Sequence, residues 1–134
     1  MDNLYADYAA VPMIVVMPYG YSESQPSDMK DGPREWTRHV YPRLDRDIIE
    51  EVVPLVDAEY STASGPENKA IAGLSMGGGH AFYIGLNHLD TFSWIGSFSS
   101  GINDMHRTLL ENPTNINKKC KLLWLACGKD DVLF

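Results

Sequence analysis

The stretch that decides the fold is Lys69-Ala-Ile-Ala-Gly-Leu-Ser-Met-Gly-Gly-Gly-His-Ala-Phe-Tyr-Ile-Gly-Leu-Asn-His88. Its first six residues, 69–74, are a short apolar run of the kind that forms a buried strand. A serine and three glycines interrupt the pattern, and residues 80–88 then predict a helix that ends near positions 87 to 89. A strand, a sharp turn and a helix in immediate succession predict an α/β fold.

Outward from this stretch, strands and helices alternate. Three more apolar runs predict strands, and the first of them, between two prolines, has the uninterrupted apolar character of a strand buried on both faces. A stripe at helical spacing predicts a helix at 41–60, with Pro42 in its first turn and a kink at Pro54. The stripe consists of Leu44, Ile48, Val52, Leu55 and Val56; the further strands are expected at 11–18, 91–97 and 121–126, a short helix at 103–110, and loops at 19–38, 61–68 and 112–119.

This alternation predicts a mostly parallel sheet with helices on both faces, in one domain that spans residues 1–134. Ligands in such folds bind beyond the carboxyl ends of the strands. The segments that follow the four predicted strands therefore share one rim of the sheet.

Composition narrows the class of protein. A net charge of −7 disfavours nucleic acid and anionic membranes as partners, and no apolar run approaches the ~20 residues of a membrane helix. No signal peptide is visible at the N-terminus. Cys120 and Cys127 flank the strand predicted at 121–126, too far apart for a disulfide, and we expect neither a metal site nor a cofactor.

Residues 73–77, Gly-Leu-Ser-Met-Gly, match the G-x-S-x-G pattern, in which a serine lies on a strained turn between a strand and a helix. The strain is in the backbone of Ser75, and Gly73 and Gly77 are expected to avoid collisions by lacking side chains. The backbone N–H of Met76 and the helix dipole then stabilise an oxyanion. The pattern predicts that Ser75 is a nucleophile.

A phosphate-binding loop is the alternative, because a glycine-rich turn before a helix also suits an anion. That kind of loop has Gly-Lys followed by Ser or Thr at the start of the helix. Here Gly79 is followed by His80, so the nucleophile is the favoured interpretation.

The acid of such a site is expected after a later strand, because the order along an α/β-hydrolase chain is serine, acid, histidine. Cys-Gly-Lys-Asp-Asp, residues 127–131, follows the strand two places beyond the nucleophile strand. We favour Asp131 over Asp130. The alternative role for either carboxylate is that of a solvated loop residue or a helix cap.

The histidine base is the difficulty, because the sequence has no histidine beyond Asp131. His39 precedes the motif, His80 lies in the predicted helix and faces away from the hydroxyl, and His88 lies at the far end of that helix. We expect these three to be surface or packing residues. His106, past the third strand on the correct rim, is the only internal candidate for the base.

Three segments together resemble the bacterial feruloyl and acetyl-xylan esterases of carbohydrate esterase family 1, alongside esterase D-like enzymes. The resemblance implies that Ser75 is the nucleophile, Met76 an oxyanion donor and Asp131 the acid in a Gly-x-x-Asp turn. It covers most of the chain and is most specific at Gly-Leu-Ser-Met-Gly-Gly. The segments are Ala72-Gly-Leu-Ser-Met-Gly-Gly-Gly-His-Ala81, Ile14-Val-Val-Met-Pro18 and Leu125-Ala-Cys-Gly-Lys-Asp-Asp131.

The same resemblance implies that parts of the family's fold lie outside these residues. The catalytic histidine belongs to a segment after Asp131, and the second oxyanion donor follows a strand that would precede residue 1. That strand would lie between those matching 12–17 and 69–74. We therefore expect a partial α/β-hydrolase that lacks N-terminal strands and the C-terminal histidine segment and is inactive alone. Three arrangements could replace the missing strand: the two flanking strands pair directly, the chain forms a homo-oligomer, or it binds a complementing chain segment.

The expected function is carboxylic ester hydrolysis, removing feruloyl or acetyl groups from plant cell-wall xylan; the partner is an ester-substituted polysaccharide or a small ester. Tyr19 and Gly20 are candidates for substrate binding, and Tyr21 and Trp36 lie in the same predicted loop. The residues Trp94 and Trp124 are expected in the core.

Two alternative functions remain: an S-formylglutathione hydrolase-like enzyme and a non-catalytic binding scaffold. The family resemblance favours a secreted or periplasmic location.

Overall fold

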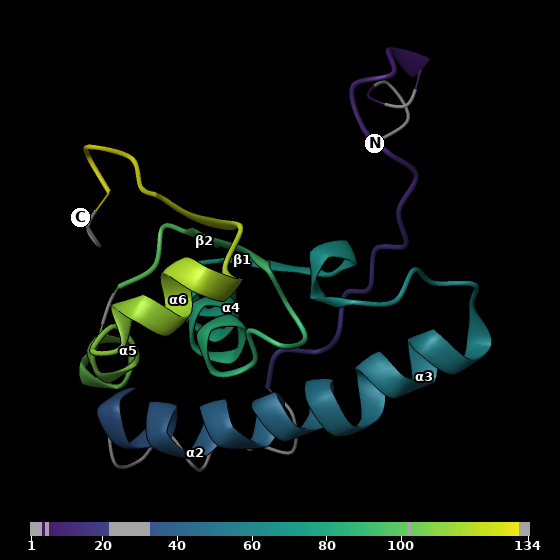
Figure 1. Cartoon of the computed structure of the whole chain (residues 1–134). Helices are drawn as coiled ribbons and strands as arrows, with labels where there is room; N and C mark the ends of the chain where they lie inside the picture. The colour runs from purple at the N-terminus through teal and green to yellow at the C-terminus, as the bar shows by residue number, and fades with distance from the viewer. Residues whose placement is uncertain (1–3, 5, 22–32, 102, 132–134) are drawn as a thin grey trace.

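The computed structural model describes residues 4, 6–21, 33–101 and 103–131, with only the backbone for 33–39 (Figure 1). Its elements alternate as the sequence predicts. In chain order they are α2 (Pro33–Arg46), the π-helical η2 (Asp47–Val52), α3 (Val53–Glu59), the 3-10 turn η3 (Pro66–Asn68), β1 (Ala70–Leu74), α4 (Met76–Asn87), β2 (Trp94–Phe98), α5 (Asp104–Leu109), α6 (Pro113–Lys119) and β3 (Leu122–Ala126). None of these described helices combines the length and apolar character needed to cross a membrane.

The three strands form one parallel sheet in the order β1-β2-β3. Leu74, Phe98 and Ala126, the last residue of each strand, are register partners, so the strands end level with one another. The predicted α/β fold class is confirmed. Strand β2 begins three residues later than predicted, because the N–H groups of Thr91 and Phe92 both donate to the carbonyl of His88 and close the end of α4.

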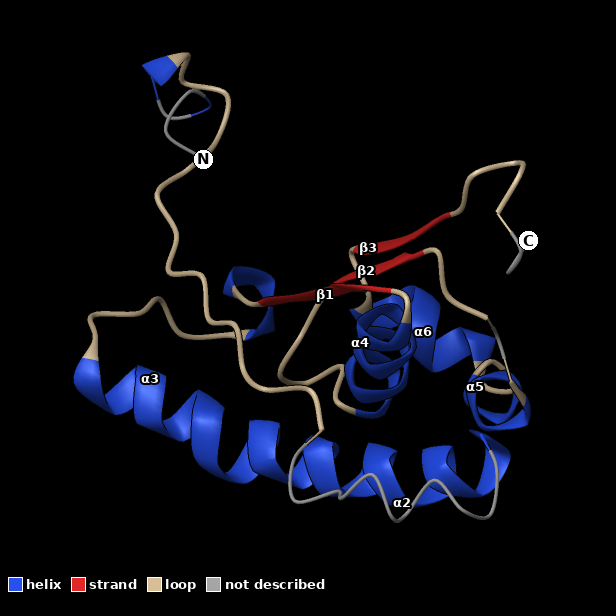
Figure 2. Ribbon diagram, turned by 180° about the vertical axis from the view of Figure 1, so that it is seen from behind, coloured by secondary structure: helices blue, strands red, loops and turns tan. Residues whose placement is uncertain are grey.

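The layers are a sheet, then α4 with α5 and α6, then the long helical run from α2 to α3 (Figure 2). In the described part of the chain the helices lie on one face of the sheet, whereas helices on both faces were expected. The uncovered face carries Trp94, 38% exposed, and Trp124, 57% exposed. The prediction that these tryptophans are core residues was wrong, because strand alternation directs them to the face without helices.

Helix α4 is the centre of the core. Eight of its twelve residues are buried, since the sheet covers one side of the helix and α2 packs against the other. Burying a side chain the size of Phe82 or Ile84 stabilises the fold by roughly 1.5–3 kcal/mol. One core cluster joins Leu44, Ile48, Ile84 and Phe92, and the second joins Phe82, Leu86, Leu89 and Ile95.

The helix predicted at 41–60 exists, but it begins at Pro33, so that Pro42 lies inside α2 rather than in its first turn. The predicted kink at Pro54 is replaced by the π-helical turn η2, where the N–H of Val53 donates to the carbonyl of Ile48. Pro54 has no N–H to donate to the preceding turn of the helix. The π-helical turn just before it contains one residue more than an α-helical turn. The insertion rotates the apolar stripe, so Leu55 is 61% exposed although it was predicted on the buried face.

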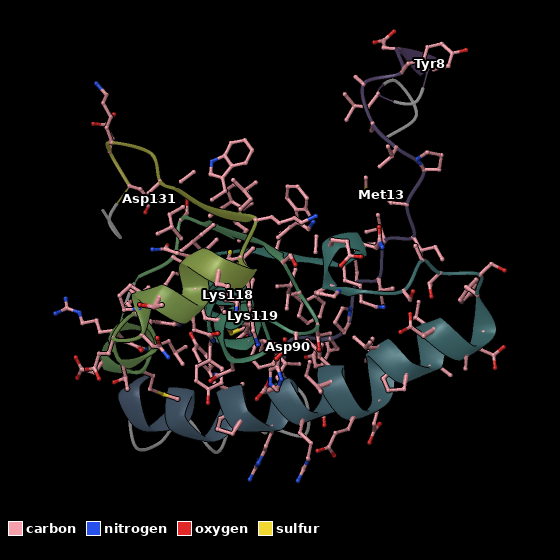
Figure 3. All side chains as sticks on the ribbon, viewed as in Figure 1. Tyr8, Met13, Asp90, Lys118, Lys119 and Asp131 are labelled. Atoms are coloured by element: carbon pink, nitrogen blue, oxygen red, sulfur yellow. The ribbon has the colours of Figure 1, made fainter. Side chains whose placement is uncertain are left out.

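Residues 11–18 do not form the predicted buried strand. They run as an extended segment away from the helices and sheet (Figure 1), and Met13 lies on this segment (Figure 3). Val15 is 57% and Met17 88% exposed. A strand needs a neighbour for its N–H and C=O groups, and within the described residues no strand pairs with this segment.

Two further boundaries differ from the sequence prediction. Residues 113–119 form α6 rather than a loop, because the side chain of Asn112 accepts from the N–H of Asn115 and Pro113 occupies the first turn. At the end of α6, Lys119 Nζ lies 2.7 Å from Asp90 Oδ1 (Figure 3). Helix α4 begins at Met76 instead of position 80, because the glycines that resemble a turn in sequence adopt helical backbone once the helix has started.

Candidate active site

Ser75 lies between β1 and α4 with φ 56° and ψ −120°, a conformation that costs a residue other than glycine about 1–3 kcal/mol. Its N–H donates to the carbonyl of Phe98 (2.8 Å) on the neighbouring strand, and its own carbonyl accepts from the N–H of Gly79 (3.1 Å). These bonds hold the turn from both sides. The Ser75 residue is exposed, and its side chain does not cap α4.

The two glycines of the motif have different roles. A Cβ at Gly73 would collide with the carbonyl of Gly77, because the helix begins directly over the strand end. A Cβ at Gly77 would meet no atom within 4 Å, so the expected steric requirement at Gly77 was wrong. It is Gly78 that faces the sheet, where a Cβ would stand 2.8 Å from Ser100 Cβ. The turn therefore requires glycine before the serine but not two positions after it.

Met76 is the first residue of α4, as predicted for an oxyanion donor. The early N–H groups of a helix lack intrahelical partners, and they carry its positive dipole end. The segment at Gly20 passes over this end, since a Cβ there would lie 3.7 Å from Met76 Cε and 3.8 Å from His80 Nδ1. On either side of Gly20, the rings of Tyr19 and Tyr21 lie 5.4 Å apart. The side chain of Trp36 lies outside the described residues.

Asp131 lies beyond the end of β3 (Figure 3), and because the strands are parallel and end in register this is the same rim of the sheet that carries Ser75. One strand, β2, stands between the two exits, so at ~4.8 Å per strand their backbones are separated by about 10 Å. The N–H of Asp131 donates to the carbonyl of Gly128 (3.0 Å), which folds residue 131 back toward the strand. Asp130 is exposed, whereas Asp131 is half-buried.

The structure does not support His106 as the base. Its Nδ1 accepts from the N–H of Asn103 (3.1 Å), so the proton is on Nε2, which lies 3.0 Å from the carbonyl of Gly79 and donates to it. The side chain is 1% exposed, and burial lowers its pKa. Both ring nitrogens are engaged in hydrogen bonds that tie α5 to α4, so neither is available to take the serine proton.

The other histidines are packing residues where their side chains are described. His80 is 5% exposed, stacks edge-on against Tyr41 with centroids 4.9 Å apart, and has its pKa lowered to about 4 by burial and by nearby His106. His88 Nε2 lies 2.6 Å from Asp45 Oδ1, a contact without the alignment of a straight hydrogen bond. The side chain of His39 lies outside the described residues.

Sequence analysis missed two residues that support the turn. Tyr41, from α2, places its hydroxyl against Gly79, where a Cβ would collide with it, and burial raises the pKa of Tyr41 to about 12. Ser99 follows β2 with φ 46°, and its N–H donates to the carbonyl of Ala126 (2.8 Å). The signal in the sequence for Ser99 is the Ser-Ser-Gly run at 99–101, which follows the strand predicted at 91–97, and no local pattern identified Tyr41.

The two cysteines lie at opposite ends of β3 as free thiols. Within the described residues no three histidine, cysteine, aspartate or glutamate side chains gather as they would around a metal ion. What the rim does bring together is an exposed serine at an uncapped helix N-terminus and a half-buried carboxylate two strands away.

Comparison with known proteins places this arrangement in a family. The esterase family, described as "Putative esterase", matches residues 1–127. An endo-1,4-beta-xylanase/feruloyl esterase of Xylanibacter ruminicola is 33% identical over 129 residues, which is 96% of this chain and 16% of that protein. The chain thus spans about one-sixth of the length of this relative.

Solved structures share the fold. The CE1 ferulic acid esterase of the anaerobic fungus Anaeromyces mucronatus superposes with a TM-score of 0.67 at 20% identity, over 94% of this chain and 61% of that one. Its complex with ferulic acid gives a TM-score of 0.66 over the same shares. By the match of nearly its whole length to the family, together with the strand–serine–helix turn, this chain belongs to the esterase family.

Proposed function

We propose that this chain is the nucleophile-bearing segment of a serine carboxylesterase that removes feruloyl groups, or acetyl groups, from plant cell-wall polysaccharide. The observation that carries the proposal is the strained conformation of Ser75 at the uncapped start of α4, on the same rim as Asp131. A protein keeps such strain where the surrounding structure requires it, and a nucleophile lifted above a sheet is one such requirement.

In this proposal Ser75 Oγ attacks the ester carbonyl and the N–H of Met76 donates to the oxyanion of the tetrahedral intermediate. A second donor and the histidine base come from parts of the fold beyond these residues. His106 has both ring nitrogens hydrogen-bonded, His88 contacts Asp45, and His80 is buried against the Tyr41 ring, which supports this division of the site. Asp131 then orients the histidine, whose imidazole ring lies in this proposal between the exits of β1 and β3, strands that are about 10 Å apart at ~4.8 Å per strand.

The acyl group is proposed to be aromatic. The relative from Xylanibacter ruminicola is named a feruloyl esterase, and the Tyr19 and Tyr21 rings flank Gly20, which lies against the oxyanion end of α4. Aromatic side chains favour stacking with an aromatic ring over contact with acetate. Tyr19, 77% exposed, and Gly20 are therefore the proposed substrate-binding residues.

A fluorophosphonate probe tests the nucleophile. The intact polypeptide that contains this segment is expected to be labelled at Ser75, Ser75→Ala to lose the label, and the 134-residue chain alone to remain unlabelled because it lacks an activated serine. Labelling that survives in Ser75→Ala would contradict the proposal. No labelling of the intact polypeptide would favour a non-catalytic scaffold.

A substrate panel then tests the acyl group. Methyl ferulate, acetylated xylan and S-formylglutathione are compared with the intact polypeptide. Higher kcat/KM for methyl ferulate than for acetylated xylan, falling at least about tenfold in Tyr19→Ala, supports an aromatic acyl group. Preference for S-formylglutathione would replace the polysaccharide esterase with a small-thioester hydrolase.

A further inference from the structure

The rim of the sheet carries a row of three small polar side chains, one after each strand. Leu74, Phe98 and Ala126 end the strands in register, so the residues that follow them are Ser75, Ser99 and Cys127. The hydrogen-bond ladder continues into this row, because the N–H of Ser75 donates to Phe98 and that of Ser99 to Ala126, both at 2.8 Å. The backbone thus fixes the spacing of the three side chains.

Ser75 and Ser99 share more than their place in the row. Both have a positive φ, 56° and 46°, although neither is glycine. The strain at Ser75 is explained by its proposed role as the nucleophile, whereas the strain at Ser99 needs an explanation of its own. Each serine turns the chain sharply away from its strand, and Ser99 in this conformation holds its hydroxyl next to the thiol of Cys127.

Cys127 also contacts the proposed acid. The turn closed by the N–H of Asp131 and the carbonyl of Gly128 (3.0 Å) brings Asp131 back onto Cys127, and the thiol and carboxylate form a hydrogen bond. An ionised carboxylate only accepts hydrogen bonds, so the thiol is the donor. The other partners of Cys127, the Ser99 hydroxyl and the Gly128 backbone N–H, then donate to the sulfur. The three groups form a chain of donors from Ser99 through Cys127 to Asp131.

We propose that Ser99 and Cys127 are positioning residues, which hold the carboxylate of Asp131 in place along the rim through this chain of hydrogen bonds. The proposal rests on the proposed function for the catalytic part played by Asp131. The contact with Cys127 also distinguishes Asp131 from the adjacent Asp130. Asp130 is exposed, and among the described contacts its carboxylate makes none with Cys127. A carboxylate held by the thiol keeps one position along the rim, from which it orients the histidine of the proposed function.

The environment of Cys127 fits a donor and not a second nucleophile. Partial burial raises the pKa of the thiol, and the Asp131 carboxylate raises it further by its charge and its hydrogen bond, while the Ser99 hydroxyl and the Gly128 backbone lower it. The thiolate is the reactive form of cysteine. A thiol whose pKa is raised above its ordinary value stays protonated at neutral pH, so it donates a hydrogen bond and does not attack an ester.

The pH dependence of Cys127 alkylation tests this arrangement without requiring esterase activity. In the Cys120→Ser background Cys127 is the only thiol, and iodoacetamide reports its thiolate fraction. Asp131→Asn is expected to lower the midpoint of the alkylation profile by about one pH unit, because a neighbouring negative charge is removed. The matched control Asp130→Asn is expected to leave the midpoint unchanged, and Ser99→Ala to raise it.

Equal shifts in Asp131→Asn and Asp130→Asn, or no shift in either, would overturn the proposal whatever the enzyme hydrolyses. In the intact polypeptide, Cys127→Ala is expected to slow fluorophosphonate labelling of Ser75 about tenfold and Cys127→Ser, which keeps a donor, to restore it. If the alkylation midpoints shift as expected but Ser75 is not labelled in any variant, the hydrogen-bond chain is supported and the esterase function is rejected. Cys127→Ala labelled at the wild-type rate would reject positioning.

Discussion

Two apolar regions of this chain differ in how deeply their side chains are buried. Residues 11–18 and the β1–α4 unit are both rich in apolar side chains, yet Met17 is 88% exposed while Ile84 is fully buried. The difference lies in the neighbours. Strand β1 pairs with β2, and α4 covers one face of both, whereas no described strand pairs with residues 11–18. Apolar composition becomes a strand only where another backbone accepts and donates its hydrogen bonds.

The comparison also shows how strain is tolerated. The unfavourable backbone of Ser75 is held by two backbone hydrogen bonds and by a helix packed on both sides. Surrounding packing of that kind is what lets a costly conformation persist. Variants that weaken the packed region should therefore have large effects, and matched variants in the extended segment should have small ones.

The largest effect is expected at Gly73, where a Cβ would collide with the carbonyl of Gly77. We expect Gly73→Ala to lower the free energy of unfolding by about 4 kcal/mol, because backbone must move to relieve the clash. The matched variant Gly77→Ala adds a methyl group to open space inside a helix and is expected to raise it by about 0.5–1 kcal/mol. Urea unfolding monitored by tryptophan fluorescence measures both. Similar losses in the two variants would contradict the assigned geometry.

A loss of similar or smaller size is expected from truncating a buried isoleucine. Ile84→Ala should lower the free energy of unfolding by about 2–5 kcal/mol, since it leaves a cavity between α4 and η2. Ile14→Ala, the same change at a position that is 49% exposed, should cost less than about 1 kcal/mol. Denaturant titrations of the pair measure the contrast directly. An equal cost at position 14 would show that residues 11–18 are buried against a partner in solution.

Acid should weaken the packed region specifically. The folded pKa of His80 is about 4, below the ordinary value near ~6.5, so between these values the unfolded chain binds the extra proton. Stability is therefore expected to be constant above pH ~6.5 and to fall as the pH drops toward ~4, by roughly 3 kcal/mol at ~1.4 kcal/mol per pKa unit. Unfolding titrations across this range measure the slope. His80→Leu should make the slope shallower and leave the part that comes from buried His106, whose pKa is also lowered, and Val15→Ala, in a segment without ionisable side chains, should keep the full slope.

The smallest effect has the opposite sign. Ser75→Gly should raise the free energy of unfolding by about 1 kcal/mol, because glycine adopts φ 56° without strain. Ser75→Ala removes the same hydroxyl but keeps the strain, so it should have little effect on stability. Thermal unfolding of the two variants separates backbone strain from loss of the hydroxyl. Equal stabilities would show that the turn carries no strain.

Local patterns in the sequence predicted much of this structure. The apolar runs located β1, β2 and β3 to within three residues, and the G-x-S-x-G spacing placed Ser75 in a strained turn before a helix. Asn103 was correctly placed at the start of a short helix. Each of these features depends on residues close together in the chain, so a short window contains its physical cause. The catalytic roles of Ser75, Met76 and Asp131 stay predictions.

Other features could not be predicted because their causes lie far apart in the chain. The exposure of Trp94 and Trp124 depends on which face of the sheet the helices cover. The engagement of His106 depends on Gly79, 27 residues earlier, and the position of Leu55 depends on a π-helical turn before Pro54. No window of a few residues contains these distances or that change of helical phase.

The sequence by itself determined the parallel α/β unit, the strained serine between strand and helix, and the carboxylate after the third described strand, because spacing and backbone stereochemistry act locally. Only the tertiary structure decided which apolar segments are buried, that His106 donates to Gly79, and that Ser99, Cys127 and Asp131 meet at one rim. Burial and hydrogen bonding of this kind require a second segment of chain, and which segment arrives is settled by the packing of the whole fold.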